Sequence, residues 1–389
     1  MIDSTQALAS RVAKAFKQTV AAAAMTSVVA ALAGCSLFSS DTRKPAQLEP
    51  NVALLDVKQV WQRPVAKANP TLVLNVTGST VVAGSADGQL AAINADTGAE
   101  LWRASVGQRL SAGVGSDGEW VAVVADNGDL VALQGGREAW RKRLPSRVYT
   151  APLVAGKRIF VLSADRSISA FDAATGEQLW AQAKTGDSLV LRESGVLTAY
   201  QDTLVAGVSG RFTALDPNGG IVRWEVPIAS ARGTNDVERL VELVGGVSLV
   251  GSSFCSRAYQ MSVGCVDMDS ARLQWTVKAE GIHGISGNAD LVVGADANGV
   301  ITAWRRDTGS VLWSSSRLRW RKLSQPLVLG RAVVFGDETG TVHMLALKDG
   351  SPLNRFGTDG SGISVAPVVA GNTLGVQTDN GAVYGFKPD

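Results

Sequence analysis

Residues Ile159–Trp180 read IFVLSADRSISAFDAATGEQLW, a pattern that recurs from one end of the 389-residue chain to the other. Ile159–Ser163 and Ser167–Asp172 are apolar, β-branched runs on either side of a short polar connection, which predicts a β-hairpin. Gly176 can supply the positive φ that the following turn requires. Glu177–Trp180 then begins a third strand, and we expect its Trp to lie in the core.

Copies of this unit are spaced along the whole chain. Val81–Trp102 and Leu291–Trp313 repeat it, each with Gly four residues before the Trp. The copy Ala332–Phe356 has Phe where the others have Trp. Successive aromatic residues from the first Trp strand to Phe356 lie 38 to 51 residues apart, a period typical of propeller blades. Weaker copies end at Trp140, Trp224 and Trp275.

The two ends of the chain complement each other. The last hairpin, Leu374–Phe386, stops before any turn and Trp strand, whereas Asp56–Val65 is a Trp strand with no hairpin before it. Pairing them completes a blade from both termini and satisfies sheet edges that an open ring would expose. We therefore predict an all-β fold: an eight-bladed β-propeller with four-stranded blades, closed by the N-terminal strand. The eight hairpins lie near Val81, Val121, Ile159, Leu204, Ser248, Leu291, Ala332 and Leu374.

The N-terminal region predicts export and lipidation. Met1–Gly34 has a positively charged start, and its uncharged run Gln18–Gly34 is short for a spanning helix but typical of a signal peptide. Leu32-Ala33-Gly34-Cys35 resembles the bacterial lipobox, in which cleavage precedes a Cys that carries lipid. The alternative is an ordinary secreted protein with an incidental Cys.

We expect three segments: a signal peptide at 1–34, the lipidated Cys35 with a flexible tether at 35–55, and the propeller at 56–389. Several acyl chains on one Cys hold a soluble domain firmly to a bilayer. Ser36 follows the Cys where Asp would resemble an inner-membrane retention signal. This resemblance implies a lipid anchor in the outer membrane, on its periplasmic face.

Charge argues against a nucleic-acid partner. The formal net charge is +2, and without residues 1–34 the chain keeps 34 basic and 34 acidic residues. Nucleic-acid-binding proteins normally need a basic surface, which a balanced chain does not favour.

Few residues are arranged for chemistry. His283 and His343 belong to different blades, and neither has a partner at metal-ligand spacing. We therefore predict no catalytic residue, no cofactor and no metal site. Cys255 and Cys265 lie ten residues apart across the fifth hairpin, so an oxidising compartment makes a disulfide plausible. Two free thiols facing apolar neighbours are the open alternative.

A lipobox followed by eight blades with repeats of the type A-x-D-x-x-T-G-x-x-x-W resembles the BamB family of outer-membrane lipoproteins, over essentially the whole chain. The repeat is shared with pyrroloquinoline-quinone (PQQ) dehydrogenases, so by itself it leaves the enzyme class open. Those enzymes resemble one another in two further features: a chain longer than this one and a pair of adjacent cysteines. Cys255 and Cys265 are not adjacent.

Two local matches concern partner binding. Ser188–Arg192 resembles the L-x-L-R segment that the BamB family uses to dock BamA, which assigns that role to Leu189, Leu191 and Arg192. Asp236–Glu242 resembles the family's nearby acidic loop, with Glu242 at the place of its first Asp and Val244 at the place of its second. The alternative is that the leucines point into blade four and Arg192 is merely solvated.

The resemblance implies a non-enzymatic scaffold of the outer-membrane β-barrel assembly (BAM) complex. Its partners would be BamA, the other BAM subunits and unfolded outer-membrane protein precursors. The competing hypothesis is a small PQQ-dependent dehydrogenase-like or ligand-binding periplasmic propeller.

Overall fold

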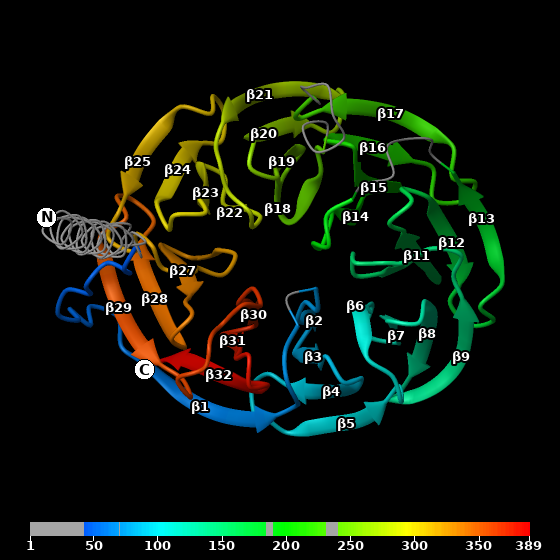
Figure 1. Ribbon diagram of the computed structural model, residues 1–389, viewed down its shortest axis with the longest axis horizontal. Coiled ribbons are helices and arrows are strands. Elements are labelled where there is room, and N and C mark those ends of the chain that lie inside the picture. The colour runs from blue at the N-terminus through cyan, green and yellow to red at the C-terminus, as the bar shows by residue number, and fades with distance from the viewer. Residues whose placement is uncertain (1–42, 70, 184–189, 231–239) are drawn as a thin grey trace, which may run out of the picture. The chain divides into compact units, whose positions relative to one another are not determined.

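In the computed structural model, residues 43–69, 71–183, 190–230 and 240–389 are described. Contacts divide the chain into Met1–Lys44 and Pro45–Asp389. The described residues form eight four-stranded antiparallel sheets and no α-helix, and the sheets stand in a ring (Figure 1), which confirms the predicted eight-bladed propeller. Within the described ranges, no helix has the length and apolar character that crossing a membrane would take.

We number the blades in chain order, each from its inner to its outer strand. The bounds of the first four are: blade 1, β2 (Asn75–Thr77), β3 (Thr80–Gly84), β4 (Gln89–Asn94) and β5 (Glu100–Ser105); blade 2, β6 (Leu110–Ser116), β7 (Trp120–Ala125), β8 (Asp129–Gln134) and β9 (Arg137–Arg143); blade 3, β10 (Leu153–Ala155), β11 (Arg158–Leu162), β12 (Ile168–Asp172) and β13 (Gln178–Gln182); blade 4, β14 (Leu197–Tyr200), β15 (Thr203–Val208), β16 (Arg211–Leu215) and β17 (Val222–Pro227).

The bounds of the other four are: blade 5, β18 (Leu243–Val250), β19 (Ser253–Ala258), β20 (Ser262–Asp267) and β21 (Arg272–Lys278); blade 6, β22 (Ser286–Gly287), β23 (Leu291–Ala295), β24 (Ile301–Arg305) and β25 (Val311–Ser315); blade 7, β26 (Leu327–Leu329), β27 (Ala332–Gly336), β28 (Thr341–Ala346) and β29 (Pro352–Gly357); blade 8, β30 (Val368–Ala370), β31 (Thr373–Gln377), β32 (Ala382–Pro388) and β1 (Val57–Pro64).

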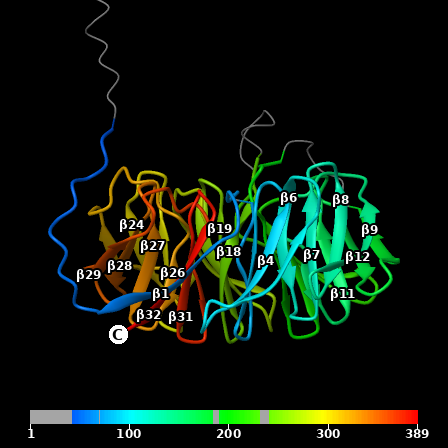
Figure 2. The ribbon, with the colours of Figure 1, turned by 90° about the horizontal axis from the view of Figure 1, so that it is seen from below.

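Blade 8 closes the ring as predicted. Its sheet order is β1-β32-β31-β30, so the first strand of the chain pairs antiparallel with the last. Val57 lies opposite Pro388 and Pro64 opposite Ala382. Figures 1 and 2 show β1 in blue beside β32 in red.

The core lies between neighbouring blades rather than within one of them. Val124 and Leu130 of blade 2, for example, pack in one cluster with Val154 and Ile159 of blade 3, and all four are buried. Both faces of the middle strands are therefore covered, which explains why these strands read as continuous apolar runs.

The repeated Trp packs on the turn of the next blade, and its burial varies. Trp61 and Trp275 are buried in the core as expected, whereas Trp140 and Trp180 are partly buried. Trp140 of blade 2 is only partly buried in its own sheet, and its Nε1 donates to the carbonyl of Ala173 in blade 3 at 2.8 Å. Gly176 has a φ of +70°, and a Cβ there would lie 2.7 Å from the Trp140 ring. The glycine therefore supplies both the turn and the space for the preceding blade's Trp. The same contact joins Trp61–Gly98, Trp102–Gly136, Trp180–Gly220, Trp275–Gly309 and Trp313–Gly350.

Every outer strand has a β-bulge just before this position. In β13, Trp180 lies opposite Ala170 and Gln178 lies opposite Phe171, which leaves Leu179 unpaired. The same shift of register occurs in β1, β5, β9, β17, β21, β25 and β29. Such bulges interrupt the free edge of a sheet and oppose pairing with another chain.

Blade 7 corrects the predicted repeat. Asn354, and not Phe356, occupies the Trp position, because Asn354 lies opposite Met344 directly after the bulge. Phe356 packs on Phe386 with the ring centroids 4.6 Å apart. The physical reason is the ring closure: the last two strands of blade 8 come from opposite ends of the chain, so no glycine turn is present there for a Trp to cover.

A segment that we call the strap, Pro45–Leu55, takes the place of that contact. The amide of Leu54 donates to the carbonyl of Leu353, and Asn354 donates from Nδ2 to the carbonyl of Leu55. Glu49 pairs with Arg317 at 2.6 Å. In Figure 2 the strap, in blue, runs down outside β29 before it enters β1. The expected flexible tether is therefore bound to blade 7 from 45 onward, and residues 35–42 lie outside the described ranges.

Candidate docking site

The predicted docking segment lies between β13 and β14, where the chain passes from blade 3 to blade 4. Leu189 falls outside the described residues, and Val190–Gly195 follow without regular strand structure. The end of the segment is held on both sides: Gly195 donates its amide to Thr150 Oγ1 at 3.0 Å, and Ser194 accepts from the amide of Gly245 at 2.6 Å. The segment is therefore fixed between blades 3 and 5.

Arg192 is the exposed member of this segment. Its guanidinium lies 5.9 Å from the centroid of the Tyr149 ring, a cation–π distance, and it forms no ion pair with any described residue. Leu191 is half-buried and lines a small cavity of about 50 Å³ together with Val190 and Tyr149. Val190 and Leu191 thus share one cavity instead of alternating between two faces, because this part of the chain is not a strand.

Glu242 lies inside the same cavity, but its charge is already compensated. Arg166 donates to its Oε1 at 2.9 Å, and the two side chains are 7% and 15% exposed. Burial raises the pKa of Glu242, and this outweighs the opposing effect of Arg166. The acid predicted to face a partner is thus part of an internal ion pair between blades 3 and 5.

Glu193 is the site residue that the sequence reasoning missed. Its side chain is half-buried and lines the cavity of Leu191 and Glu242. It has no hydrogen bond and no ion pair with any described residue, and burial raises its pKa. The signal in the sequence was its place directly after the L-x-L-R match.

A second cavity opens beside Glu193 at the inner strands. It has a volume of about 310 Å³ and is lined by residues from several blades, among them Thr150, Glu193, His283 and Gln325. Burial and the positive charge of Arg257 lower the pKa of His283 to about 4, so this side chain is neutral at pH 7. Glu193 is therefore an acid that faces both cavities at this end of the ring.

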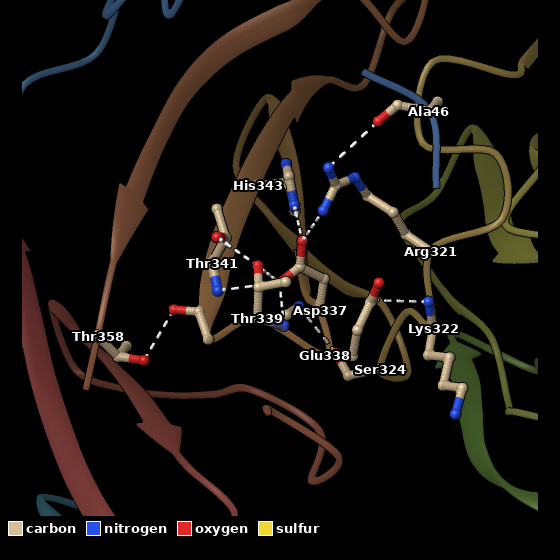
Figure 3. A network of polar contacts seen from close by, with 12 residues as sticks. Ala46, Arg321, Lys322, Ser324, Asp337, Glu338, Thr339, Thr341, His343 and Thr358 are labelled. Carbon is tan, nitrogen blue, oxygen red and sulfur yellow. Dashed lines mark hydrogen bonds and ion pairs between the residues drawn. The ribbon is translucent and has the colours of Figure 1, made fainter. Parts of the chain in front are cut away.

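A different polar cluster lies in blade 7 (Figure 3). Asp337 is fully buried, and its Oδ2 accepts from Arg321 and from His343, each at 2.9 Å. Its Oδ1 accepts from the amide and hydroxyl of Thr339. Arg321 also donates to the carbonyl of Ala46 in the strap. This cluster ties the strap to the blade and leaves Asp337 with no opening for a ligand.

Cys255 and Cys265 lie directly opposite each other on β19 and β20, with a Cα–Cα distance of 4.0 Å, and the structure joins their sulfur atoms. Both are fully buried. Whether the pair is oxidised in the purified protein stays a prediction, which counting reactive thiols in the denatured, unreduced chain would test.

The described residues contain no group of three His, Cys, Asp or Glu side chains that could hold a metal ion. His283 and His343 lie in separate clusters, the first at the larger cavity and the second on Asp337.

Comparisons with known proteins agree on one family. The family model described as outer membrane protein assembly factor BamB matches residues 86–315. A protein of Burkholderia pseudomallei with the same description is 37% identical over 376 residues, 96% of this chain and 99% of the relative. The crystal structure of BamB from Moraxella catarrhalis has a TM-score of 0.78 at 23% identity, covering 85% of this chain and all of that one.

The fold alone is shared more widely. The quinohemoprotein alcohol dehydrogenase of Comamonas testosteroni has a TM-score of 0.64 at 15% identity, covering 88% of this chain and 78% of that one. Since this identity is low, the similarity concerns the propeller and not the chemistry.

Proposed function

The chain belongs to the BamB family of outer membrane protein assembly factors, and from this membership we propose that it is a non-enzymatic scaffold subunit of the BAM complex. It is anchored by lipid on Cys35 to the periplasmic face of the outer membrane. There it binds BamA and assists the insertion of outer-membrane proteins.

The observation that supports the docking part is the state of Arg192. A guanidinium that is exposed, stacked on Tyr149 and unpaired within the described residues is available to a partner's carboxylate. Arginine beside half-buried apolar side chains is the composition of an interaction hot spot. Leu191 and Tyr149 supply the apolar part.

The test is the affinity of the soluble domain for the periplasmic part of BamA. Arg192→Ala should weaken binding by about 1–3 kcal/mol without changing the melting temperature. Arg137→Ala is the matched control, because Arg137, at the start of β9, is an exposed arginine whose side chain has no partner among the described residues. Equal affinity of the two variants and the wild type would reject this face as the docking site.

The anchor is tested separately. Cys35→Ala should give a folded protein that no longer fractionates with membranes, since the propeller core lies in the unit Pro45–Asp389. The measurement needs cells without BamA, because docking alone could hold the variant at the membrane. A variant that stays membrane-bound under this condition would contradict lipidation at Cys35.

Unfolded precursors are proposed to contact the outer wall of the ring. Leu101 on β5 is 52% exposed and Val311 on β25 is 61% exposed, and both stand beside the bulges. The bulges oppose the continuous strand addition that β-augmentation requires, so apolar side-chain contact is the route that this surface favours.

A further inference from the structure

We propose that Glu193 is the receptor for a basic side chain, arginine or lysine, of the protein that docks on this face of the ring. The inference rests on the proposed function, because it names the chemical group that the docking partner must contribute. It begins from a half-buried carboxylate that has no counter-charge among the described residues.

None of the basic residues that the structure describes around Glu193 forms an ion pair with it. Arg166, which lines the same small cavity, is bound to Glu242 at 2.9 Å. Arg192 is turned to the ring of Tyr149. Arg257, the buried arginine whose charge acts on His283, donates from Nη1 to the carbonyls of Ala279 and Glu280, and its Nε and Nη2 have no hydrogen bond to any described residue. No described group therefore neutralises Glu193.

The position of Glu193 is fixed before any partner arrives. The next two residues, Ser194 and Gly195, are hydrogen-bonded to Gly245 in blade 5 and to Thr150 ahead of blade 3. A carboxylate on a fixed backbone binds a cation with little loss of conformational entropy. Its unfavourable burial in the free protein becomes favourable once a partner charge arrives.

The surroundings select the class of ligand. The cavity of about 310 Å³ beside Glu193 has room for one long side chain. The other polar side chains that line it are uncharged at pH 7: Thr150, Ser194, His283, Gln325 and Ser364. Phosphates and carboxylates would be repelled by Glu193. A metal ion in this larger cavity would find Glu193 as the one carboxylate among the described residues that line it, and the described residues contain no group of three His, Cys, Asp or Glu that could hold a metal. A guanidinium or ammonium group fits both the charge and the space.

The experiment compares affinity and stability in the same variants. Glu193→Gln keeps the shape and removes the charge, so affinity for the periplasmic part of BamA should fall about tenfold or more. The melting temperature should be unchanged or higher, because an uncompensated carboxylate is removed. The matched control is Glu177→Gln, an exposed carboxylate just before β13, at the opposite end of that strand from Glu193. Its affinity should equal that of the wild type.

Charge exchange identifies the partner residue and does not depend on one variant. Glu193→Arg should abolish binding, and changing one basic residue of BamA to Glu should restore at least part of it. Unchanged affinity of Glu193→Gln, with Arg192→Ala still weakened, would overturn the role of Glu193 and leave the docking face in place. Unchanged affinity of both variants would overturn the proposed function as well.

Discussion

Blades 4 and 7 each keep a carboxylate away from water, and they treat it in opposite ways. Asp337 in blade 7 is fully buried and accepts from Arg321, His343 and Thr339. Glu193, which leads into blade 4, is half-buried and has no partner among the described residues. The first charge is satisfied by the chain itself, whereas the second is not.

The pKa values of the two groups follow this difference. Burial raises the pKa of both, but for Asp337 the hydrogen bonds from His343 and Thr339 outweigh burial, and its pKa lies well below the usual range. For Glu193 no described residue supplies an opposing contact, and burial raises its pKa. A carboxylate with internal hydrogen-bond donors, such as Asp337, can thus be distinguished from one without them, such as Glu193, by the direction of its pKa shift.

The largest expected effect is at the satisfied carboxylate. Asp337→Asn leaves Arg321, 10% exposed, without a counter-charge, which should lower the free energy of unfolding by about 3–5 kcal/mol. Urea unfolding measures this loss. Asp126→Asn is the control, because Asp126 pairs with Arg109 at the surface and should change stability by less than about 1 kcal/mol. Similar losses of unfolding free energy in both variants would show that the buried Asp337 stabilises the fold no more than a surface carboxylate does.

His283 extends the comparison to the pH dependence of stability. His283 has a folded pKa of about 4, below its unfolded value, so only the unfolded state takes up a proton as the pH falls from about 6.5 to 4. The free energy of unfolding of the wild type should therefore fall by about 2–3 kcal/mol over this range because of His283 alone. The free energy of unfolding of His283→Asn should fall correspondingly less between pH 7 and 4.5. If the free energy of unfolding, plotted against pH, gives parallel curves for the two proteins, His283 does not titrate in this way.

The smallest effect separates two acids of one cavity. Glu242→Gln removes one ion-pair partner of Arg166 and should lower the free energy of unfolding by about 1–2 kcal/mol. The same substitution at Glu193 should leave the free energy of unfolding unchanged. Thermal unfolding of the two variants side by side decides the matter, and a loss of equal size at Glu193 would mean that its charge is already satisfied in the free protein.

Much of the fold could be predicted because each blade repeats one local pattern. The hairpin around Ile159, the turn at Gly176 and the strand before Trp180 all form as expected, since apolar alternation and turn chemistry act within a few residues. The closure by β1 could also be predicted, because each terminus lacks what the other supplies.

The departures all depend on contacts between blades. In blade 7, Asn354 occupies the position that Trp has in other blades, because the next blade has no glycine turn. Counting residues in the sequence could not detect the bulge that shifts the register there. The pair Arg166–Glu242 joins residues 76 apart in the sequence, so Glu242 looked like a free acid. Glu193 was missed because a lone charged residue in a sequence carries no sign of what does or does not neutralise it.

The pairing of β1 with β32 also sets the order in which the molecule can be completed. A ribosome makes Val57 long before Pro388, so the eighth sheet cannot form until β32 has been made. Any chain that stops before β32 leaves β1 and β31 with unpaired edges, which proteases and other chains can reach. Ring closure therefore makes resistance to degradation depend on β32, because β1 and β31 have no common partner until that strand is present.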